Sequence, residues 1–483
     1  MREVALSASF SRRVWAVFIS LAGLALVIRL ALLVGYQPVA YSDTASYRRL
    51  AEQLSRGWVE YDASRTPGYP IFLALTGTNE RAWLAQMSLG ILLTLLFFYL
   101  GWELAVGFSA EKRLTFAALA SLAHTLNLGQ LFFESALLTE TLATFWLVLA
   151  LAGFAWGITH ADRRSVWLCL GIGLASSLAA IVRPLFVFLP FGLAALTVLF
   201  WRTPDEAGSQ SAGGKNRLLC AILARLKTAA RWWTAICLPA VVILGGWVGF
   251  LRHQYGVWGL SVMTGYHLIQ NTGTFFEYLP DEYAPLRDTY LKYRDAQVAE
   301  HGTPTNAIWD AIPEMQEVSG QSFIGLSQLL TKLSLQLMWE HPDLYLQNIV
   351  KGWWLFWRAP VYWSPEAFRW QQGVFLVKGL ILGQRAALFA CNLFFLAATA
   401  LFAFWKPFRR WLQPPMTFGF LASVIWFTSL IQTFLDHGDN ARFLAPLQSV
   451  VVLCVLWIVL KLVARRGQSP IRAESELSGG LAD

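Results

Sequence analysis

The stretch YSDTASYRRLAEQLSRGWVEYDASRTPGYP, residues 41–70, follows directly on the first long apolar segment of the chain. Apolar residues within it recur at the spacing of one helical face: Tyr47, Leu50, Ala51 and Leu54. This period predicts a short helix with one apolar side, lying along a membrane surface. Arg65, Pro67 and Pro70 then interrupt the chain and begin a second apolar stretch, at positions where proline suits the start of a helix.

The composition of the whole chain supports a membrane setting. Of its 483 residues, 56% are hydrophobic and 14% are charged, whereas soluble domains carry about 25% charged residues. The 23 Trp and 33 Phe suit many lipid-facing helices with aromatic belts at both interfaces. The net charge of +8 comes from Lys and Arg gathered in short loops between apolar segments, which indicates the positive-inside pattern rather than a nucleic-acid surface.

The five cysteines give no sign of a disulfide framework or a zinc site. Four of them lie in apolar segments and Cys220 lies in a basic loop, without any Cys-x-x-Cys motif. At the N-terminus, Arg12 and Arg13 precede an apolar run that continues past Arg29 to about Tyr36 without a convincing cleavage site. We therefore expect a retained signal anchor with its N-terminus inside.

About ten apolar segments come close to the roughly 20 residues that a membrane-spanning helix needs. They cover residues 14–34, 82–106, 114–132, 136–158, 233–251, 385–405, 416–434 and 443–463, with two more inside 166–201, divided at Arg183 and Pro184. The chain is predicted to be an all-α polytopic membrane protein. Its architecture would be a bundle of about ten transmembrane helices, with interfacial helices and one large external loop region.

Shifts of composition divide the chain into parts. The parts are an N-terminal transmembrane module 1–252 with its first external loop 36–81 and a cytoplasmic linker 203–232, an external region 253–384, C-terminal transmembrane helices 385–464, and a tail 465–483. The linker combines a flexible stretch with a basic amphipathic helix of the interfacial kind. Acidic residues balance basic ones in the external region, and the polar tail is expected to be disordered and cytoplasmic.

Several charged residues are predicted on the same external side as Asp43. They are Glu134, Glu140, Arg183, Arg358, Asp436, His437, Asp439 and Arg442. Charges near bilayer depth are costly unless they are paired or functional, so each is a candidate site residue. Structural interpretations also stand: Glu134 and Glu140 pairing with Arg183, the side chains of Arg29, Arg358 and Arg385 snorkelling to the interface, and a merely solvated turn at 436–439.

Short motifs form an ordered set along roughly residues 14–460. They are Asp43 with Arg-Thr-Pro-Gly-Tyr-Pro at 65–70, Leu-Leu-Thr-Glu-Thr-Leu at 137–142, Val-Arg-Pro at 182–184, Arg-His-Gln-Tyr-Gly at 252–256, Thr-Gly-Tyr-His at 264–267, Glu-His-Pro at 340–342 and Arg-Phe-Leu-Ala-Pro-Leu at 442–447. Together they resemble the GT-C class of membrane glycosyltransferases, more narrowly the bacterial branch of the protein mannosyltransferase and aminoarabinose transferase superfamily (glycosyltransferase family 39-like).

The resemblance implies a GT-C-like bundle in a bacterial inner membrane. It implies transfer of a hexose or pentose from a polyprenyl-phosphate-linked donor to an acceptor hydroxyl on the periplasmic face, with inversion. Asp43 would be the general base, with Glu140 beside it. A structural interpretation of Asp43 stands next to this, since aspartate is among the best N-caps of a helix and capping does not exclude catalysis.

The donor's phosphate needs cationic partners, because arginine holds such a charge by paired hydrogen bonds. Arg442 is the first candidate, followed by Arg183 and Arg358. Further candidates for the site are Tyr47, Arg65, His267, His437 and Asp439. No cofactor is certain, and a divalent metal ion at Asp43 and Glu140 is left open.

The partners and the reaction class leave alternatives. The acceptor is a glycan, a lipid or a protein, membrane lipids surround the chain, and no nucleic acid is expected. Relatives often carry an aromatic or acidic residue after the first aspartate, where this chain has Thr44, so the resemblance does not identify the acceptor. A flippase or transporter of lipid-linked sugars would also place charges at a cavity, although the chain has no internal repeat. An oligosaccharide ligase or polymerase would use the same donors.

Overall fold

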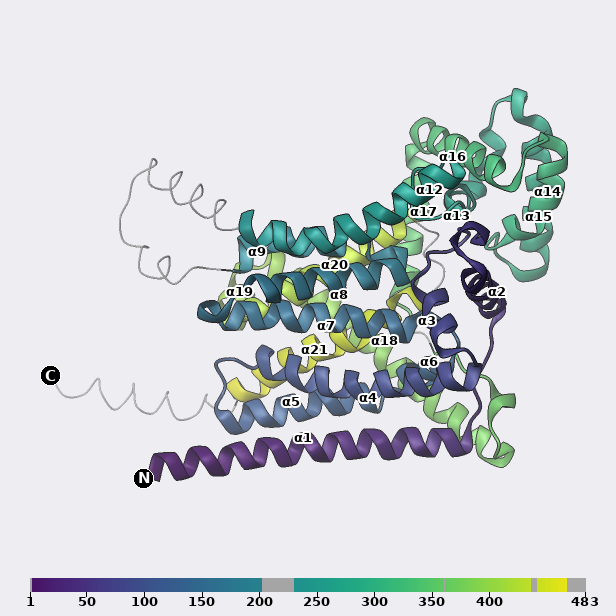
Figure 1. Ribbon diagram of the computed structural model, residues 1–483. Helices are drawn as coiled ribbons and strands as arrows, with labels where there is room; N and C mark the ends of the chain where they lie inside the picture. Colours follow the sequence, from purple (N-terminus) through teal and green to yellow (C-terminus); the bar gives the residue numbers. More distant parts are fainter. Residues whose placement is uncertain (1, 202–229, 360, 436–440, 467–483) are drawn as a thin grey trace, which may run out of the picture.

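The computed structural model describes residues 2–201, 230–359, 361–435 and 441–466. Regular structure in these ranges is entirely helical, and one isolated bridge joins Val39 to Ala136. Figure 1 shows long helices lying side by side, with shorter helices gathered at one end of the bundle. The all-α prediction is confirmed for this part of the chain.

The helices form two sets. The set that makes up the bundle is α1 (Arg2–Gly35), α4 (Asn79–Leu104), α5 (Ala110–Thr125), α7 (Glu140–Thr159), α8 (Val166–Val182), α9 (Leu189–Phe200), α12 (Gly246–Tyr255), which continues a π-turn at Val241–Gly245, α18 (Val374–Phe404), α20 (Met416–Leu435) and α21 (Ala445–Arg466). The set gathered at one end is α2 (Ser42–Arg56), α3 (Gly68–Thr76), α6 (Leu128–Ser135), α13 (Thr264–Thr272), α14 (Ala284–His301), α15 (Ala307–Ser319), α16 (Phe323–Glu340) and α17 (Pro342–Phe356), whereas α19 (Lys406–Leu412) lies at the other end (Figure 1).

Seven helices among the described residues are long and apolar enough to cross a membrane, or eight if the bent pair α5 and α6 is one span. The seven are Ser11–Gly35, Asn79–Leu104, Glu140–Thr159, Ala230–Tyr255, Gln371–Phe404, Met416–Phe434 and Ala441–Ala464. Their number and composition make the chain an integral, multi-pass membrane protein. The two segments predicted inside 166–201 form the shorter apolar helices α8 and α9, which meet at Arg183 and Pro184.

Three predicted boundaries are wrong, each for a local reason. The segment 114–132 is two helices bent by 50°, because the Asn127 side chain accepts from the Gly129 N–H and begins α6 as a new helix. The segment predicted from residue 136 starts at Glu140, since Leu137 N–H instead donates to Val39 O at 3.0 Å. The span predicted from Arg385 starts at Gln371, because the helix continues past this exposed arginine.

The helices pack around one large apolar core. The central helix α4 packs against α5 and α7, and α21 packs against α5, α7, α18 and α20. By contrast α1 lies at the edge of the bundle, where it touches α4 and α5 (Figure 1). The predicted linker helix and the tail lie largely outside the described residues, so their predictions stay untested.

Candidate functional site

Asp43 stands in the first turn of α2, at the end of the bundle where the short helices gather. The N-cap of α2 is Tyr41, so the interpretation of Asp43 as the N-cap is wrong. The Tyr41 N–H donates to the Thr44 hydroxyl at 2.9 Å, and that hydroxyl donates to Leu137 O at 3.0 Å. The predicted apolar face is confirmed, because Tyr47 and its neighbours one turn on are buried. The Asp43 carboxylate is thereby left to contact other side chains.

Both oxygens of the Asp43 carboxylate meet a guanidinium group. Arg65 Nη2 donates to Oδ1 at 2.8 Å, and Arg442 Nη2 donates to Oδ2 at 3.0 Å. Arg65 comes from the end of the first loop, whereas Arg442 lies in the single turn η9 (Ala441–Leu444) before α21. Residues almost 400 positions apart are therefore joined through one carboxylate.

Glu140 extends this contact into the bundle. Its Oε1 lies 3.1 Å from Arg442 Nε and 2.8 Å from Arg183 Nη1. Neither approach has the alignment of a hydrogen bond, and the Glu140 carboxylate has no aligned donor among the residues described. We call the chain of contacts Arg65, Asp43, Arg442, Glu140 and Arg183 the ion-pair network.

The exposed fraction of the side chains falls along the ion-pair network from Asp43 to Glu140. The side chains of Asp43, Arg65 and Arg442 are 20%, 26% and 18% exposed, whereas those of Glu140 and Arg183 are 2% and 6% exposed. The network therefore has an accessible edge at Asp43 and a buried end at Glu140. A ligand that approaches from the surface would meet Asp43, Arg65 and Arg442 first.

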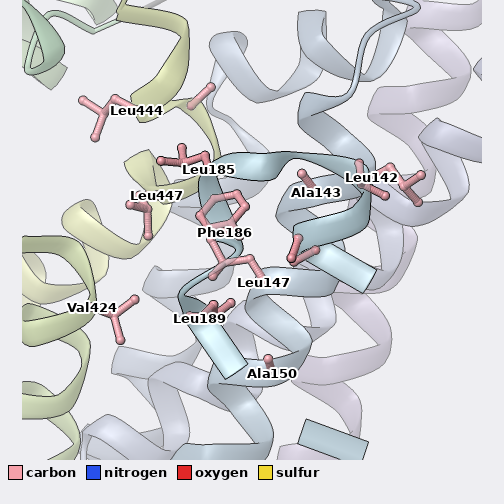
Figure 2. Close-up of a cluster of buried hydrophobic side chains, with 14 of the residues drawn as sticks. Leu142, Ala143, Leu147, Ala150, Leu185, Phe186, Leu189, Val424, Leu444 and Leu447 are labelled. Carbon is pink, nitrogen blue, oxygen red and sulfur yellow. The ribbon is translucent and has the colours of Figure 1, made fainter. Parts of the chain in front are cut away.

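Apolar packing under the network holds its elements together. The residues that follow Glu140, Arg183 and Arg442 in sequence turn inward and meet in one cluster, which Figure 2 shows. They include Leu142, Ala143, Leu147, Leu185, Phe186, Leu189, Leu444 and Leu447. Because α7, η3 (Pro184–Phe186) and α21 share this cluster, the charged residues at or just before the starts of these elements are held at one level of the bundle.

A backbone contact places Arg183. Gly68, the first residue of α3, lies so close to α8 that a Cβ atom there would be 2.6 Å from Ile181 O. Only glycine allows this approach, because a side chain would press on backbone atoms that cannot move aside. The Tyr69 hydroxyl then donates to Gln86 Oε1 at 2.8 Å, and Gln86 Nε2 donates to Ala136 O at 2.7 Å. The motif at 65–70 thus ties the first loop to the segments that carry Arg183 and Glu140.

The turn at residues 61–64, just before Arg65, is held by three hydrogen bonds from α12 and the segment before α13, which we call the clasp. Val262 N–H donates to Ala63 O at 3.1 Å, the Ser261 hydroxyl donates to Ser64 O at 3.0 Å, and the Tyr255 hydroxyl donates to Tyr61 O. Ala63 has a φ of 54°, which a residue with a Cβ rarely adopts. A non-glycine residue in this region is held there by its surroundings.

The charges around Asp43 keep it ionised. Burial by itself would raise the pKa of Asp43, but Arg65 and Arg442 outweigh burial and hold this pKa below its ordinary value. The guanidinium of Arg65 also lies 5.4 Å above the ring of Tyr47. At neutral pH the group at the accessible edge is therefore a carboxylate between two cations.

The other predicted site residues separate into two groups. Tyr47, Arg65, Arg183, Glu140 and Arg442 gather around Asp43, as described. Arg358 has an exposed side chain and makes no ion pair with any described residue, and the His267 ring lies against Trp309 at 6.0 Å. His437 and Asp439 lie outside the described residues, as does Asp436.

Glu134 belongs to a different pair. Arg29 Nε and Nη2 donate to its two carboxylate oxygens at 2.9 and 2.6 Å, and both side chains are 2% exposed. Arg29 therefore does not snorkel to the interface, and Glu134 does not pair with Arg183. The pair attaches the edge helix α1 to α6.

Two tyrosines near the network were missed in the sequence. The rings of Tyr41 and Tyr362 lie 5.7 Å apart, edge to face, and Tyr362 also stacks on Phe133. Burial, with Tyr36, Tyr362 and Glu140 nearby, raises the pKa of Tyr41, so its hydroxyl stays protonated. Tyr41 could have been found from the sequence, because it lies two residues before Asp43. No local feature of the sequence points to Tyr362.

The carboxylates proposed as metal ligands do not fit a metal ion in this arrangement. Arg442 lies between Asp43 and Glu140, and each contacts a second arginine. The residues described also contain no group of three His, Cys, Asp or Glu side chains close enough to hold one. We derive no chemical step through a metal.

Comparison of the chain with family models, with curated proteins and with solved structures gives no match. The site is therefore interpreted from its own geometry and from the motifs in the sequence.

Proposed function

We propose that the protein is a membrane glycosyltransferase. It transfers a sugar from a polyprenyl-phosphate donor to an acceptor hydroxyl, with inversion, in a GT-C-like bundle of about ten transmembrane helices. The observation that carries the proposal is the ionised Asp43 carboxylate at the accessible edge of a network whose Arg442 also reaches Glu140. Such an arrangement offers a proton acceptor beside cations for a phosphate leaving group.

Asp43 acts as the general base in this mechanism. The acceptor hydroxyl attacks the anomeric carbon, the bond from that carbon to the phosphate oxygen breaks, and the hydroxyl proton passes to Asp43. A depressed pKa makes Asp43 a weak base, so its contribution comes from placement next to the attacking oxygen. The departing polyprenyl phosphate carries away the electron pair of the broken bond.

The charge of the network suits that leaving group. Its five side chains comprise three guanidinium groups and two carboxylates, an excess of one positive charge. An uncompensated charge in a poorly solvated site is unfavourable, and a phosphate would neutralise it. Arg442 is the best phosphate ligand, because its side chain is accessible on one edge and lies between both carboxylates.

Donor binding would also release the base. Asp43 cannot accept a proton well while both of its oxygens take hydrogen bonds from guanidinium groups. A phosphate that draws Arg442 toward itself removes one of these bonds and frees Oδ2. The mechanism therefore expects the donor to bind before the acceptor.

Release of polyprenyl phosphate by purified protein tests the function. Polyprenyl-phosphate hexoses and pentoses are supplied with detergent-solubilised acceptor membranes, and free polyprenyl phosphate and glycosylated product are measured together. Wild-type protein is expected to form both in equal amounts. Movement of intact donor across a vesicle membrane without cleavage would instead establish a flippase, and products of many sugar units would establish a polymerase.

The sidedness of the site is tested by cysteine labelling. We propose that the α13–α16 region and the Asp43 loop face the periplasm of a bacterial inner membrane, since short loops such as that at Asp162 hold the positive charge. In a protein without native cysteines, Glu300→Cys is expected to react with an impermeant thiol reagent in intact cells. Asp162→Cys should react only after lysis. Both residues are exposed. The reverse pattern would contradict the orientation.

Arg442→Lys is expected to weaken donor binding by about tenfold, the loss of one charged hydrogen bond. Lysine keeps the charge but lacks the planar fork whose Nε and Nη2 face Glu140 and Asp43 separately. Steady-state kinetics with donor and acceptor varied separately should show a raised donor KM and a nearly unchanged acceptor KM. Wild-type donor dependence in this variant would remove Arg442 from the phosphate site.

Arg65→Gln is expected to move the acid limb of kcat/KM toward neutral pH. A carboxyl whose folded pKa is depressed stays ionised until the pH falls below the ordinary aspartate value of about 4. Arg65 is the larger of the two cationic influences, so removing it raises the pKa of Asp43. The ionised Asp43 carboxylate also contributes to the free energy of unfolding. This contribution is present above the unfolded pKa of Asp43 and is lost as the pH falls through its folded pKa. An unmoved acid limb would show that Asp43 is not the titrating base.

A further inference from the structure

A cavity of about 440 Å³ opens at the end of the bundle opposite the ion-pair network. Its wall comes from three places: the turn between α4 and α5, the connection from α19 to α20, and the last turns of α21. Figure 1 shows these segments together at the end where α19 lies. Because the walls are ends of membrane-spanning helices, the cavity lies at the level of a membrane surface.

The polar wall of this cavity is basic. Lys112 from α5 and Lys461 from α21 line it together with Ser109 and Gln413, and no carboxylate of a described residue lines it. Neither lysine has an ion-pair partner among the residues the structure describes, and the neighbouring Glu111 is not one of the residues that line the cavity. Two ammonium groups that line one cavity, with no described carboxylate beside them, favour an anion there.

The apolar wall has a different character. Trp457 lies against the cavity with its ring packed on Phe418 at 5.1 Å, and Lys461 Nζ lies 5.7 Å over the ring of Phe108. Aromatic rings beside ammonium groups are typical of the region where lipid headgroups meet acyl chains. A free anion would use the lysines alone, whereas a lipid would use both walls.

We propose that this cavity binds the phosphate headgroup of an anionic glycerophospholipid. The phosphate lies between Lys112 and Lys461, the Ser109 hydroxyl donates to it, and the first carbons of the lipid lie along Trp457 and Phe108. Basic pockets between transmembrane helices are known to hold acidic headgroups in this way. The site is separate from the ion-pair network and does not depend on the proposed reaction.

Native mass spectrometry of the purified full-length protein tests this proposal, with phosphatidylglycerol and phosphatidylcholine as probes. The wild type should bind phosphatidylglycerol in preference. Lys112→Gln with Lys461→Gln should bind phosphatidylglycerol about thirty-fold more weakly, the loss expected for two lysines at an anionic membrane surface, and phosphatidylcholine as before. The matched control is Lys406→Gln with Arg410→Gln, which removes two exposed charges from α19 outside the cavity. It should keep the wild-type affinity.

Three results would overturn the proposal. Equal losses in both double variants would show a general effect of surface charge, and equal binding of the two lipids by wild type would exclude an acidic headgroup. Displacement of phosphatidylglycerol by inorganic phosphate at equal concentration would show a site for a free anion. If the glutamine variant fails to fold, Lys112→Arg with Lys461→Arg replaces it, and this variant must retain the preference for phosphatidylglycerol.

Discussion

Asp43→Asn is expected to lower the rate of sugar transfer by about 10²- to 10⁴-fold, the usual loss of a general base. Asparagine has nearly the shape of aspartate, so the helix α2 and its buried face are retained. Its amide cannot take up the acceptor proton, and it leaves Arg65 and Arg442 without an anion between them. The rate of product formation at saturating donor and acceptor measures the effect.

Asp62→Asn is the matched control for this experiment. Asp62 lies in the same loop and pairs with Arg49 at 2.8 Å on the surface, outside the ion-pair network. Its Oδ1 accepts from the Ser64 N–H, which asparagine can also do. We expect near wild-type rates and unchanged thermal unfolding in this variant. Full activity of Asp43→Asn, or an equal loss in Asp62→Asn, would rule out Asp43 as the base.

Arg29→Met is expected to reduce the free energy of unfolding by about 3–5 kcal/mol, the usual effect of leaving one partner of a buried ion pair alone. Glu134 would remain buried without its partner beside Gly90, where a Cβ atom would lie only 2.2 Å from the carboxylate, so it has no room to turn away. Equilibrium unfolding in mild detergent measures the loss.

Two further variants separate pairing from general charge effects. Arg29→Met combined with Glu134→Gln removes both charges, so much of the lost stability should return. Arg56→Met removes a cation from the exposed pair with Glu60, and such pairs contribute about 0–1 kcal/mol. If Arg29→Met were no more destabilised than Arg56→Met, the buried pair would not be what attaches α1 to the bundle.

Much of the candidate site could be predicted from the sequence because its charged residues occur where an apolar chain should have none. Glu140 at the head of α7, Arg183 at a Pro-interrupted apolar run and Arg442 before α21 are each conspicuous for this reason. The helix at 42–56 was also predictable, since its apolar period is regular. These features depend on residues close together in the chain.

The ion-pair partner of each charged residue could not be predicted from the sequence. Glu134 pairs with Arg29 rather than Arg183 because α6 and α1 are neighbours in space, and no local pattern records that neighbourhood. The same holds for Tyr362, which reaches Tyr41 from a segment more than 300 positions later. Arg358 and His267 were singled out by charge and motif, and their roles stay predictions, since no printed contact joins either to the ion-pair network.

The clasp on the turn at residues 61–64 makes the two halves of this end of the bundle mechanically dependent on each other. Arg65 is the next residue after this turn, and three hydrogen bonds hold the turn, one from the end of α12 and two from the segment that leads into α13. A tilt of α13 and the helices packed on it would therefore pull the chain one residue from the guanidinium that holds Asp43. The unusual φ of Ala63 leaves the turn little freedom to absorb such a movement. A large molecule that docks against α13–α16 would thus move Arg65 and change its contact with the Asp43 carboxylate, without touching Asp43 itself.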